Sequence, residues 1–511
     1  MSGSARKASP KPASGQSASG KSASGKPPGA GARKPRDARS APRRPAGGSA
    51  ASARQARATP RPVAAPAAAD GPLLRVHPDV IEAGVSAVLR LDGPADLVLR
   101  GFFREHAYLG RRDRGVVAET VFDVLRHRRL YAHLAQGLGG SLARACTRLS
   151  ILRRFGDAAV PGLDLPAPLL EALQRVLTID PQSLAQPIRL SLPDWLHAEL
   201  LQQAVAATVV PAVSPESEGA VRSPAEAAAS DAMPLTPEQR VERLGQVLLQ
   251  PAPLDLRVNV LKTDRTAALA ALHAAGIEAV ALDVPTTAIR VQGKPALERV
   301  PAFEQGWFEV QDAGSQRLVE FAAPKRGQTV VDFCAGAGGK TLALAGAMRS
   351  SGQIYACDVS AARLQRLRPR LTRSGATNVQ PFGLDSERDP KLKRLAGRAD
   401  LVLVDAPCSG TGTLRRNPEL KWRMQSQDID ALSVLQSSIL AAAAALVKPG
   451  GTLVYATCSL LERENEAVVE AFDAARLGFD APQFLRLHPD EVDTDGFFAA
   501  RWVRLPRPAV S

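Results

Sequence analysis

The fold of this chain is decided by the stretch VVDFCAGAGGKTLALA, Val330 to Ala345. An apolar run leads into a glycine-rich turn, and a segment of helical composition follows. The part GGKT ends like a phosphate-binding P-loop. The first question is therefore whether this turn holds a nucleoside triphosphate or a different ligand.

Apolar runs recur after the glycine-rich turn, separated by helical segments. From residue 327 onward the expected strands are TVVDF, GQIYACD, NVQPFGLD, DLVLVDAP and GTLVYATCS. Strands that are apolar on both faces and alternate with helices indicate a parallel sheet between helix layers. The sequence predicts a Rossmann-like, doubly wound α/β domain, with ligands beyond the carboxyl ends of its strands.

The P-loop pattern fails at its first position. Such a loop needs Gly, four residues and then Gly-Lys-Ser/Thr, and Cys334 stands where the first glycine belongs before Gly339-Lys340-Thr341. The run from Leu401 to Asp405 does have the apolar-strand-plus-Asp form of a Walker B segment. A P-loop nucleoside triphosphatase therefore stays open as an alternative.

Acidic residues at the strand ends favour a cofactor without phosphates. Gly336, Gly338 and Gly339 let a ligand approach the backbone, and Asp358 stands twenty residues after Gly338, where a carboxylate accepts hydrogen bonds from ribose hydroxyls. The acids that end or follow the expected strands are Asp332, Asp358, Asp385 and Asp405. Carboxylates repel phosphate but suit a sulfonium, so the pattern favours S-adenosylmethionine over ATP.

Two cysteines follow neighbouring expected strands. Cys408 lies in DAPCSGTGTLRRNPELKW and Cys458 in YATCSLLEREN, and each is followed by a serine. A single buried cysteine is usually a small apolar filler. Two thiols at adjacent strand ends lie over one crevice, which indicates chemistry instead.

One reaction class needs a thiol beside a methyl donor. Carbon 5 of cytosine is too weak a nucleophile to accept a methyl group directly, so a thiolate must first add at carbon 6. The spacing of Cys408 and Cys458 does not tell which thiol attacks.

CAGAGGKT, DAPCSGTGTLRRNPELKW and TCSLLEREN closely resemble signature segments of the Nop/Sun-type RNA (cytosine-5)-methyltransferases, nearest to the bacterial 16S rRNA branch, which is RsmB-like. The resemblance covers about residues 251–505 and includes RVN at Arg257, GWFEVQDAGSQ at 306–316 and DGFFAARW at 495–502. It implies S-adenosylmethionine as cofactor and RNA as partner, with 16S rRNA as the expected substrate and tRNA as an alternative. A non-catalytic RNA-binding ribosome assembly factor is the alternative from another class.

The resemblance also implies residue roles. Cys458 is the expected nucleophile, Cys408 serves product release, Asp405 lies beside cofactor and base, and Lys340 orients either of them. The expected cofactor-binding residues are Cys334, Ala335, Gly336, Ala337, Gly338, Gly339, Lys340, Asp358, Asp385 and Asp405. The residues expected to face RNA phosphate are Arg415, Arg416, Lys421 and Arg423.

Two segments depart from the family pattern. The usual loop reads CAAPGGKT, whereas this chain has Gly336-Ala337, which makes the turn more flexible. The usual Pro-Glu-Glu-Asn is here Glu462-Arg463-Glu464-Asn465. Because both cysteines are present, we expect an active enzyme.

The net charge of +14 is concentrated at the N-terminus. Residues 1–72 hold 14 lysines and arginines against two aspartates, which leaves only +2 for the other 439 residues. This segment has no aromatic residue, and its composition predicts a disordered basic tail. Such a tail either binds nucleic-acid phosphate without specificity or only solubilises the protein.

The remaining chain is divided into three expected domains. Residues 73–250 form a helical domain that more weakly resembles the NusB-like RNA-binding domain, with a flexible insert at about 209–234. Residues 251–310 form a small α/β RNA-positioning subdomain, and 311–511 form the catalytic domain. Two sets of arginines either bind RNA or form solvated helix faces: Arg111, Arg112, Arg114, Arg126, Arg128, Arg129, Arg153 and Arg154 in the helical domain, and Arg363, Arg366, Arg370 and Arg373 later.

Composition also predicts several absences. No apolar run approaches the roughly eighteen residues of a membrane helix, and the first residues lack the apolar core of a secretory signal. The five cysteines form no CxxC pair and have no histidine at metal-binding spacing. We expect a cytoplasmic, metal-free monomer.

Overall fold

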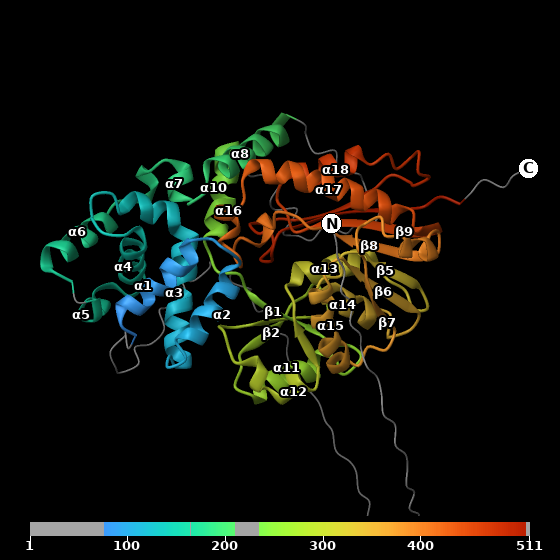
Figure 1. Cartoon of the computed structure of the whole chain (residues 1–511), viewed down its shortest axis with the longest axis horizontal. Helices are drawn as coiled ribbons and strands as arrows, with labels where there is room; N and C mark the ends of the chain where they lie inside the picture. Colours follow the sequence, from blue (N-terminus) through green and yellow to red (C-terminus); the bar gives the residue numbers. More distant parts are fainter. Residues whose placement is uncertain (1–75, 164, 210–234, 507–511) are drawn as a thin grey trace, which may run out of the picture. The chain divides into compact units, whose positions relative to one another are not determined.

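The computed structural model describes residues 76–163, 165–209 and 235–506, and Figure 1 labels their elements. The expected basic tail, 1–72, lies outside these residues. The expected flexible insert, 209–234, also lies outside them, except for Val209, which ends a helix. Among the described residues no helix is both long and apolar enough to cross a bilayer.

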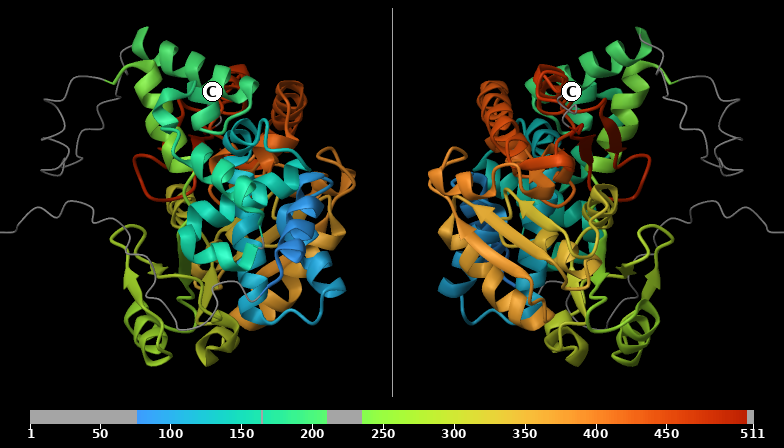
Figure 2. Two further views of the ribbon diagram at one scale, coloured as in Figure 1. Left: turned by 90° about the vertical axis from the view of Figure 1, so that its left-hand side faces the viewer. Right: turned by 90° about the vertical axis from the view of Figure 1, so that its right-hand side faces the viewer.

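The segment before residue 250 is helical, as predicted. Ile81, Val121, Leu125 and Leu149 are fully buried in one core between its first helices, which Figure 2 shows in blue to green. The helices are α1 Pro78–Leu89, α2 Ala95–Glu105, α3 Arg111–Leu134, α4 Leu142–Phe155, α5 Val160–Leu163, α6 Ala167–Leu177, α7 Gln186–Arg189, α8 Asp194–Val209 and α10 Pro237–Leu248.

Helices α8 and α10 pack on the segment that follows the second cysteine motif. Leu196 and Leu244 share a buried cluster with Leu460 and Leu461. Gln203 Nε2 donates a 3.0 Å hydrogen bond to the Leu460 carbonyl. The helical segment therefore supports the loop that carries Cys458.

A small antiparallel sheet precedes the glycine-rich turn. Its strand order is β2-β3-β1-β4, and Leu256, Leu272, Ile289 and Phe308 form its core with the helices beside it. The elements are β1 Leu254–Val258, α11 Arg265–Ala274, β2 Ala279–Ala281, β3 Ala288–Val291, α12 Pro301–Glu304 and β4 Phe308–Val310.

A seven-stranded sheet carries the five predicted strands. Its order is β10-β11-β9-β8-β5-β6-β7, and the pairs among β5 to β9 are parallel. Two further strands, not predicted from the sequence, extend one edge, with β11 antiparallel to β9. The strands are β5 Thr329–Asp332, β6 Gln353–Asp358, β7 Val379–Gly383, β8 Ala399–Asp405, β9 Val447–Thr457, β10 Gln483–Leu487 and β11 Phe497–Val503.

Alternate residues of the central strands face opposite helix layers. Val331 and Val402 pack toward α17 and α18, whereas Val330 and Leu401 pack toward α13 and α14. This is a Rossmann-like α/β sandwich, as predicted. Its helices are α13 Ala313–Ala322, α14 Gly339–Ala347, α15 Ala361–Ser374, α16 Leu420–Arg423, α17 Ser426–Ala444 and α18 Glu466–Ala471.

Candidate active site

The glycine-rich loop joins β5 to α14 and has two left-handed positions. Gly338 caps the helix with a φ of +84°, and a Cβ added there would lie 2.1 Å from Leu367 Cδ1. Only glycine fits this position. Gly336 has a φ of +57°, but a Cβ there would meet nothing within 4 Å, so its open side can accept a ligand.

Acids at the strand ends anchor this loop. Asp358 accepts hydrogen bonds from the Gly336 amide at 2.8 Å and from the Ser360 amide at 2.7 Å. Asp332 accepts one from Thr341 Oγ1 at 2.6 Å, and its Oδ1 has no partner in the described part of the chain. Burial raises the pKa of Asp332 to about 7.

Lys340 and Asp405 form an ion pair over the strand ends. Lys340 Nζ lies 2.7 Å from Asp405 Oδ2 and 5.4 Å from the ring centre of Phe497. Burial lowers the pKa of Lys340, but the Asp405 carboxylate more than offsets this effect, so the pKa lies above its usual value. Lys340 therefore stays cationic at neutral pH.

The two cysteines predicted to share a crevice do meet. Cys408 Sγ lies 3.4 Å from Cys458 Sγ, within hydrogen-bond distance for sulfur, and both residues are half-buried. The hydrogen bond to Cys458 and then burial hold the pKa of Cys408 well above its usual range. Cys408 therefore keeps its proton at neutral pH while Cys458 is beside it.

Glu464 fixes the two cysteine loops relative to each other. It is fully buried and accepts hydrogen bonds from the Ser409 amide at 2.8 Å, from Ser409 Oγ at 2.5 Å and from Ser459 Oγ at 2.5 Å. Sequence reasoning did not assign this role. The available signal was a serine after each cysteine together with the glutamate retained from the family pattern.

Two glycines, Gly412 and Gly496, join the two cysteine loops to a third loop, the one that precedes β11. The Gly412 amide donates to the Cys458 carbonyl at 2.9 Å, and the Gly496 amide donates to the Gly412 carbonyl at 2.8 Å. A Cβ on Gly412 would lie 2.3 Å from the Gly496 oxygen. Because residue 412 has no side chain, its backbone packs directly on the backbone of Cys458 and of Gly496.

The other expected cofactor-binding residues lie around the same sheet edge. Ala335 is buried, and burial also raises the pKa of Cys334 well above its usual value. Asp385 follows β7, next to the strand that ends at Asp358, and its side chain is 89% exposed. Its Oδ2 lies 3.4 Å from Lys391 Nζ.

The structure corrects the expectation that Arg415 and Lys421 face RNA phosphate. Both are buried. Arg415 pairs with Asp493 at 2.7 Å, and Lys421 donates to the Arg126 carbonyl of the helical segment at 3.0 Å. Burial lowers the pKa of Lys421 to about 7.

The remaining two of these residues differ from each other. Arg416 is partly buried and pairs with Asp495 at 3.0 Å and Asp312 at 3.4 Å, so its charge is balanced by carboxylates of the protein. Arg423 is exposed and makes no side-chain hydrogen bond within the described residues. Its contact with RNA stays a prediction.

Many of the other candidate arginines also bind protein groups. Arg126 donates to the Arg415 carbonyl, Arg129 to the Leu192 carbonyl, and Arg154 pairs with Glu119. Arg128 and Arg153 lie over aromatic rings. Within the described residues, Arg111 and Arg112 are exposed and make no ion pair or side-chain hydrogen bond.

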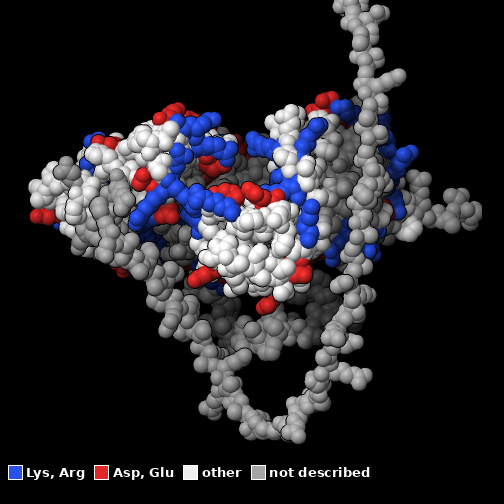
Figure 3. All heavy atoms as spheres, turned by 90° about the horizontal axis from the view of Figure 1, so that it is seen from below, with Lys and Arg blue, Asp and Glu red and all other residues white. Residues whose placement is uncertain are grey.

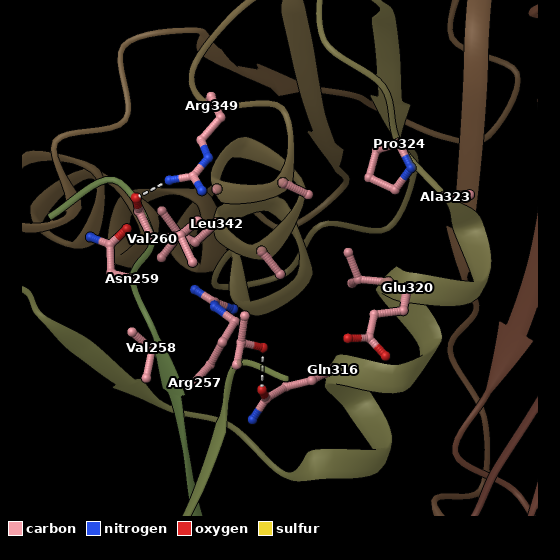
Figure 4. A pocket seen from close by; sticks show the side chains of 15 residues that line it. Arg257, Val258, Asn259, Val260, Gln316, Glu320, Ala323, Pro324, Leu342 and Arg349 are labelled. Atoms are coloured by element: carbon pink, nitrogen blue, oxygen red, sulfur yellow. Dashed lines mark hydrogen bonds between the residues drawn. The ribbon is translucent and has the colours of Figure 1, made fainter. Parts of the chain in front are cut away.

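A cavity of about 400 Å³ lies away from the thiols, among the end of β1, α13 and α14. Figure 4 shows it, with Leu342 among the apolar residues and Glu320 and Arg349 among the charged ones. It contains neither cysteine of the pair nor any of the strand-end acids. We therefore place the candidate active site by its chemistry, at the strand ends.

Family comparisons match the two parts that contain these elements. The family model described as 16S rRNA methyltransferase RsmB/F matches residues 319–503. The model described as Methyltr_RsmF/B-like, ferredoxin-like domain matches residues 235–298.

Individual proteins are similar over about the same region. A probable ribosomal RNA small subunit methyltransferase B from Synechocystis sp. is 42% identical over 220 residues, which are 43% of this chain and 49% of that protein. A ribosomal RNA small subunit methyltransferase B from Sodalis glossinidius is 39% identical over 262 residues, 50% of this chain and 60% of that protein. The chain thus spans roughly half the length of these relatives.

One solved structure is similar over most of this chain. The protein PH0851 aligns with 84% of this chain and 99% of its own, with a TM-score of 0.64 and 25% sequence identity.

Proposed function

We propose, on the premise that this chain belongs to the RsmB/F methyltransferase family, that it methylates carbon 5 of a cytosine in RNA through a covalent bond to Cys458. The observation that carries this proposal is the 3.4 Å approach of two thiols beside the Lys340–Asp405 ion pair. The names of the relatives favour 16S rRNA as the substrate. An rRNA substrate implies that the protein works in the cytoplasm.

The cofactor is S-adenosylmethionine, which supplies an electrophilic methyl group when bound. The loop fits it because Gly336 opens toward free space. The strand-end acids that suit a sulfonium and a ribose also disfavour a triphosphate. The loop from Cys334 to Lys340 holds the methionine part, with Asp358 at the ribose and Asp385 and Asp405 nearby.

Cys458 begins the reaction by bonding to carbon 6 of the target cytosine. Electron density then moves through the ring toward carbon 5 and nitrogen 3. Asp405 and the cationic Lys340, 2.7 Å apart, share a proton near nitrogen 3 and stabilise the added charge. Carbon 5 takes up the methyl group, which leaves it with both a methyl group and a hydrogen.

Product release follows from the coupling of the two thiols. Once the sulfur of Cys458 is a thioether, it carries no proton and no charge, so its hydrogen bond and its charge no longer raise the pKa of Cys408, and only burial and Glu464 still do. The Cys408 thiol then passes its proton to solvent, and the resulting thiolate takes the proton from carbon 5. The electron pair restores the ring double bond, and the bond from carbon 6 to Cys458 breaks, which regenerates the thiolate.

A second observation supports RNA as the partner. A cavity of about 410 Å³ at the junction of α2 and α3 is lined by two phenylalanines, three arginines, a leucine and an aspartate: Phe103, Phe122, Arg100, Arg104, Arg114, Leu99 and Asp96. Arg111 and Arg112 are exposed at the start of α3. Aromatic rings beside guanidinium groups suit an unstacked base and its phosphates. On the face drawn in Figure 3, lysine and arginine side chains gather in several groups.

Methylation of purified RNA tests the proposed function. The full chain is incubated with unmodified 16S rRNA and with tRNA in separate reactions, each with methyl-labelled S-adenosylmethionine, and the nucleosides are analysed. We expect 5-methylcytidine in the 16S rRNA. Label only in tRNA would favour the alternative substrate, and absence of label in both would favour the non-catalytic assembly factor. Binding of ATP but not S-adenosylmethionine would favour the P-loop nucleoside triphosphatase.

A further inference from the structure

Two guanidinium groups from outside the glycine-rich loop hold its carbonyl groups. Arg370 Nη1, on α15, donates to the Ala337 carbonyl at 2.7 Å. Arg257 Nη1, on β1, donates to the Gly339 carbonyl at 2.9 Å. Together they fix two peptide planes, one on each side of Gly338.

Arg370 is itself oriented by a buried carboxylate. Glu309, on β4 of the small sheet, accepts from Arg370 Nε at 3.3 Å and from Nη2 at 3.0 Å. Arg373, one turn further along α15, binds the other oxygen of Glu309 but makes no hydrogen bond with the loop within the described residues. The two arginines therefore share one ion-pair partner and differ in whether they touch the loop.

Arg257 is a buried cation whose side-chain hydrogen bonds go to carbonyl oxygens. It donates to Gln311 Oε1 as well as to the Gly339 carbonyl. Within the described residues, no carboxylate accepts a hydrogen bond from it. Burial lowers its pKa to about 10, which still leaves it charged at neutral pH. A buried charge is costly unless its donors are satisfied. Figure 4 shows Arg257 reaching from its strand toward α14.

The need for such support follows from the loop sequence. Gly336 and Ala337 stand where the usual loop has Ala-Pro, so the stiff pyrrolidine ring is missing. Gly336 adopts a left-handed φ of +57°, which alanine rarely takes and which glycine can easily leave. The chain therefore lacks the local stiffness of the usual loop, and the arginine contacts restrain two of its peptide groups.

We propose that Arg370 and Arg257 are positioning residues that hold the glycine-rich loop, which lacks the usual Ala-Pro, in its cofactor-binding path. The inference rests on the proposed function, because it takes the ligand to be S-adenosylmethionine. A loop released from these contacts samples more conformations, so ligand binding must restrict more of them and has a larger entropic cost. Cofactor affinity should fall while the thiol chemistry stays intact.

The matched variants are Arg370→Met and Arg373→Met. Each removes one ion pair to Glu309, but only the first removes a contact with the loop. Calorimetry with S-adenosylhomocysteine, the demethylated product, measures affinity without turnover. We expect about tenfold weaker binding for Arg370→Met, the scale of one lost charged hydrogen bond, and a change under about twofold for Arg373→Met.

Kinetics and hydrogen exchange separate positioning from general stability. In Arg370→Met the KM for S-adenosylmethionine should rise, with kcat and the KM for RNA unchanged. Without ligand, amide exchange in residues 334–341 should be faster in Arg370→Met than in Arg373→Met. If Arg370→Met does not fold, the pair Arg370→Lys and Arg373→Lys answers the same question, because one ammonium cannot reproduce the forked contacts of Arg370.

Equal affinity and equal loop exchange in the two arginine variants would overturn this inference. That result leaves the proposed function intact, provided that the wild-type protein binds S-adenosylhomocysteine. If the wild-type protein does not bind it, the proposed cofactor is wrong and the inference fails with it.

Discussion

Cys408 Sγ and Cys458 Sγ lie 3.4 Å apart, although fifty residues separate them in the chain. The contact arises because β8 and β9 are parallel neighbours, so the segments after them meet at the same edge of the sheet. Glu464 then binds the serine that follows each cysteine. The two thiols are thereby held as a pair, and the hydrogen bond to Cys458 raises the pKa of Cys408.

Replacement of Cys408 should trap the covalent intermediate. In Cys408→Ser the hydroxyl is a far weaker acid than a thiol and does not supply the base, so turnover should fall by about 100-fold or more. A protein–RNA adduct should then accumulate and be visible on a denaturing gel. The control is Cys408→Ser combined with Cys458→Ala, which should give no adduct. An adduct in the double variant would place the nucleophile elsewhere.

Two glycines of the cofactor loop should respond differently to alanine. Gly338→Ala places a Cβ 2.1 Å from Leu367, so we expect lower stability and loss of S-adenosylhomocysteine binding. Gly336→Ala meets no atom within 4 Å and carries only the cost of its left-handed φ, about 1 kcal/mol. Thermal unfolding and calorimetry of both variants check this order. A milder effect at Gly338 would contradict the loop geometry.

Asp332 should make the stability of the protein pH-dependent. Its folded-state pKa of about 7 exceeds the roughly 3.9 of an unfolded aspartate, so the folded state binds the extra proton between these values. The free energy of unfolding therefore falls as pH rises through this window. Asp332→Asn removes the titration. The free energy of unfolding of Asp332→Asn, taken relative to that of the wild type, should rise by up to about 4 kcal/mol from pH 4 to pH 8.

Urea unfolding at several pH values measures the Asp332 effect. The comparison uses the difference between the two proteins at each pH, so a constant effect of the amide cancels. Parallel stability profiles for wild type and Asp332→Asn would show that Asp332 is ionised in the folded protein throughout this range.

The arginines at the junction of α2 and α3 should contribute to RNA binding. Arg104→Ala combined with Arg111→Ala should weaken binding and lower the salt dependence of log K by about one to two units. Arg175→Ala, an exposed arginine on α6, is the control. S-adenosylhomocysteine binding should not change in either protein. An unchanged salt slope in the double variant would place the RNA elsewhere.

The sequence was sufficient to predict β5, β6, β8 and β9 because their apolar runs each end at, or are followed directly by, an Asp or a Cys. The short β7, which contains the exposed Gln380, was predicted from its place between two helical segments. The sequence did not predict β10 and β11. Phe484 in β10 is exposed, and the DGFFAARW segment was read as a family motif without a strand assignment. An antiparallel strand added at a sheet edge depends on pairing with β9, which local composition does not encode.

The basic residues show where sequence reasoning fails for a physical reason. Arg415 and Lys421 are charged and belong to the polar segment GTGTLRRNPELKW, so solvent exposure was the natural prediction. Helix α3 packs over them, and Trp422 Nε1 donates to the Leu125 carbonyl at 2.7 Å. This contact joins residues almost three hundred positions apart. Such burial is set by tertiary packing, whereas the cysteine pair follows from strand order.

The most direct test of the account is methyl transfer by Cys458→Ala. The full chain and this variant are compared with the same 16S rRNA and labelled S-adenosylmethionine, with calorimetry to confirm that both bind S-adenosylhomocysteine. Because the proposed mechanism assigns the attack on carbon 6 to Cys458, we predict normal cofactor binding and no 5-methylcytidine. Formation of 5-methylcytidine at the wild-type rate would contradict the central claim that Cys458 is the nucleophile.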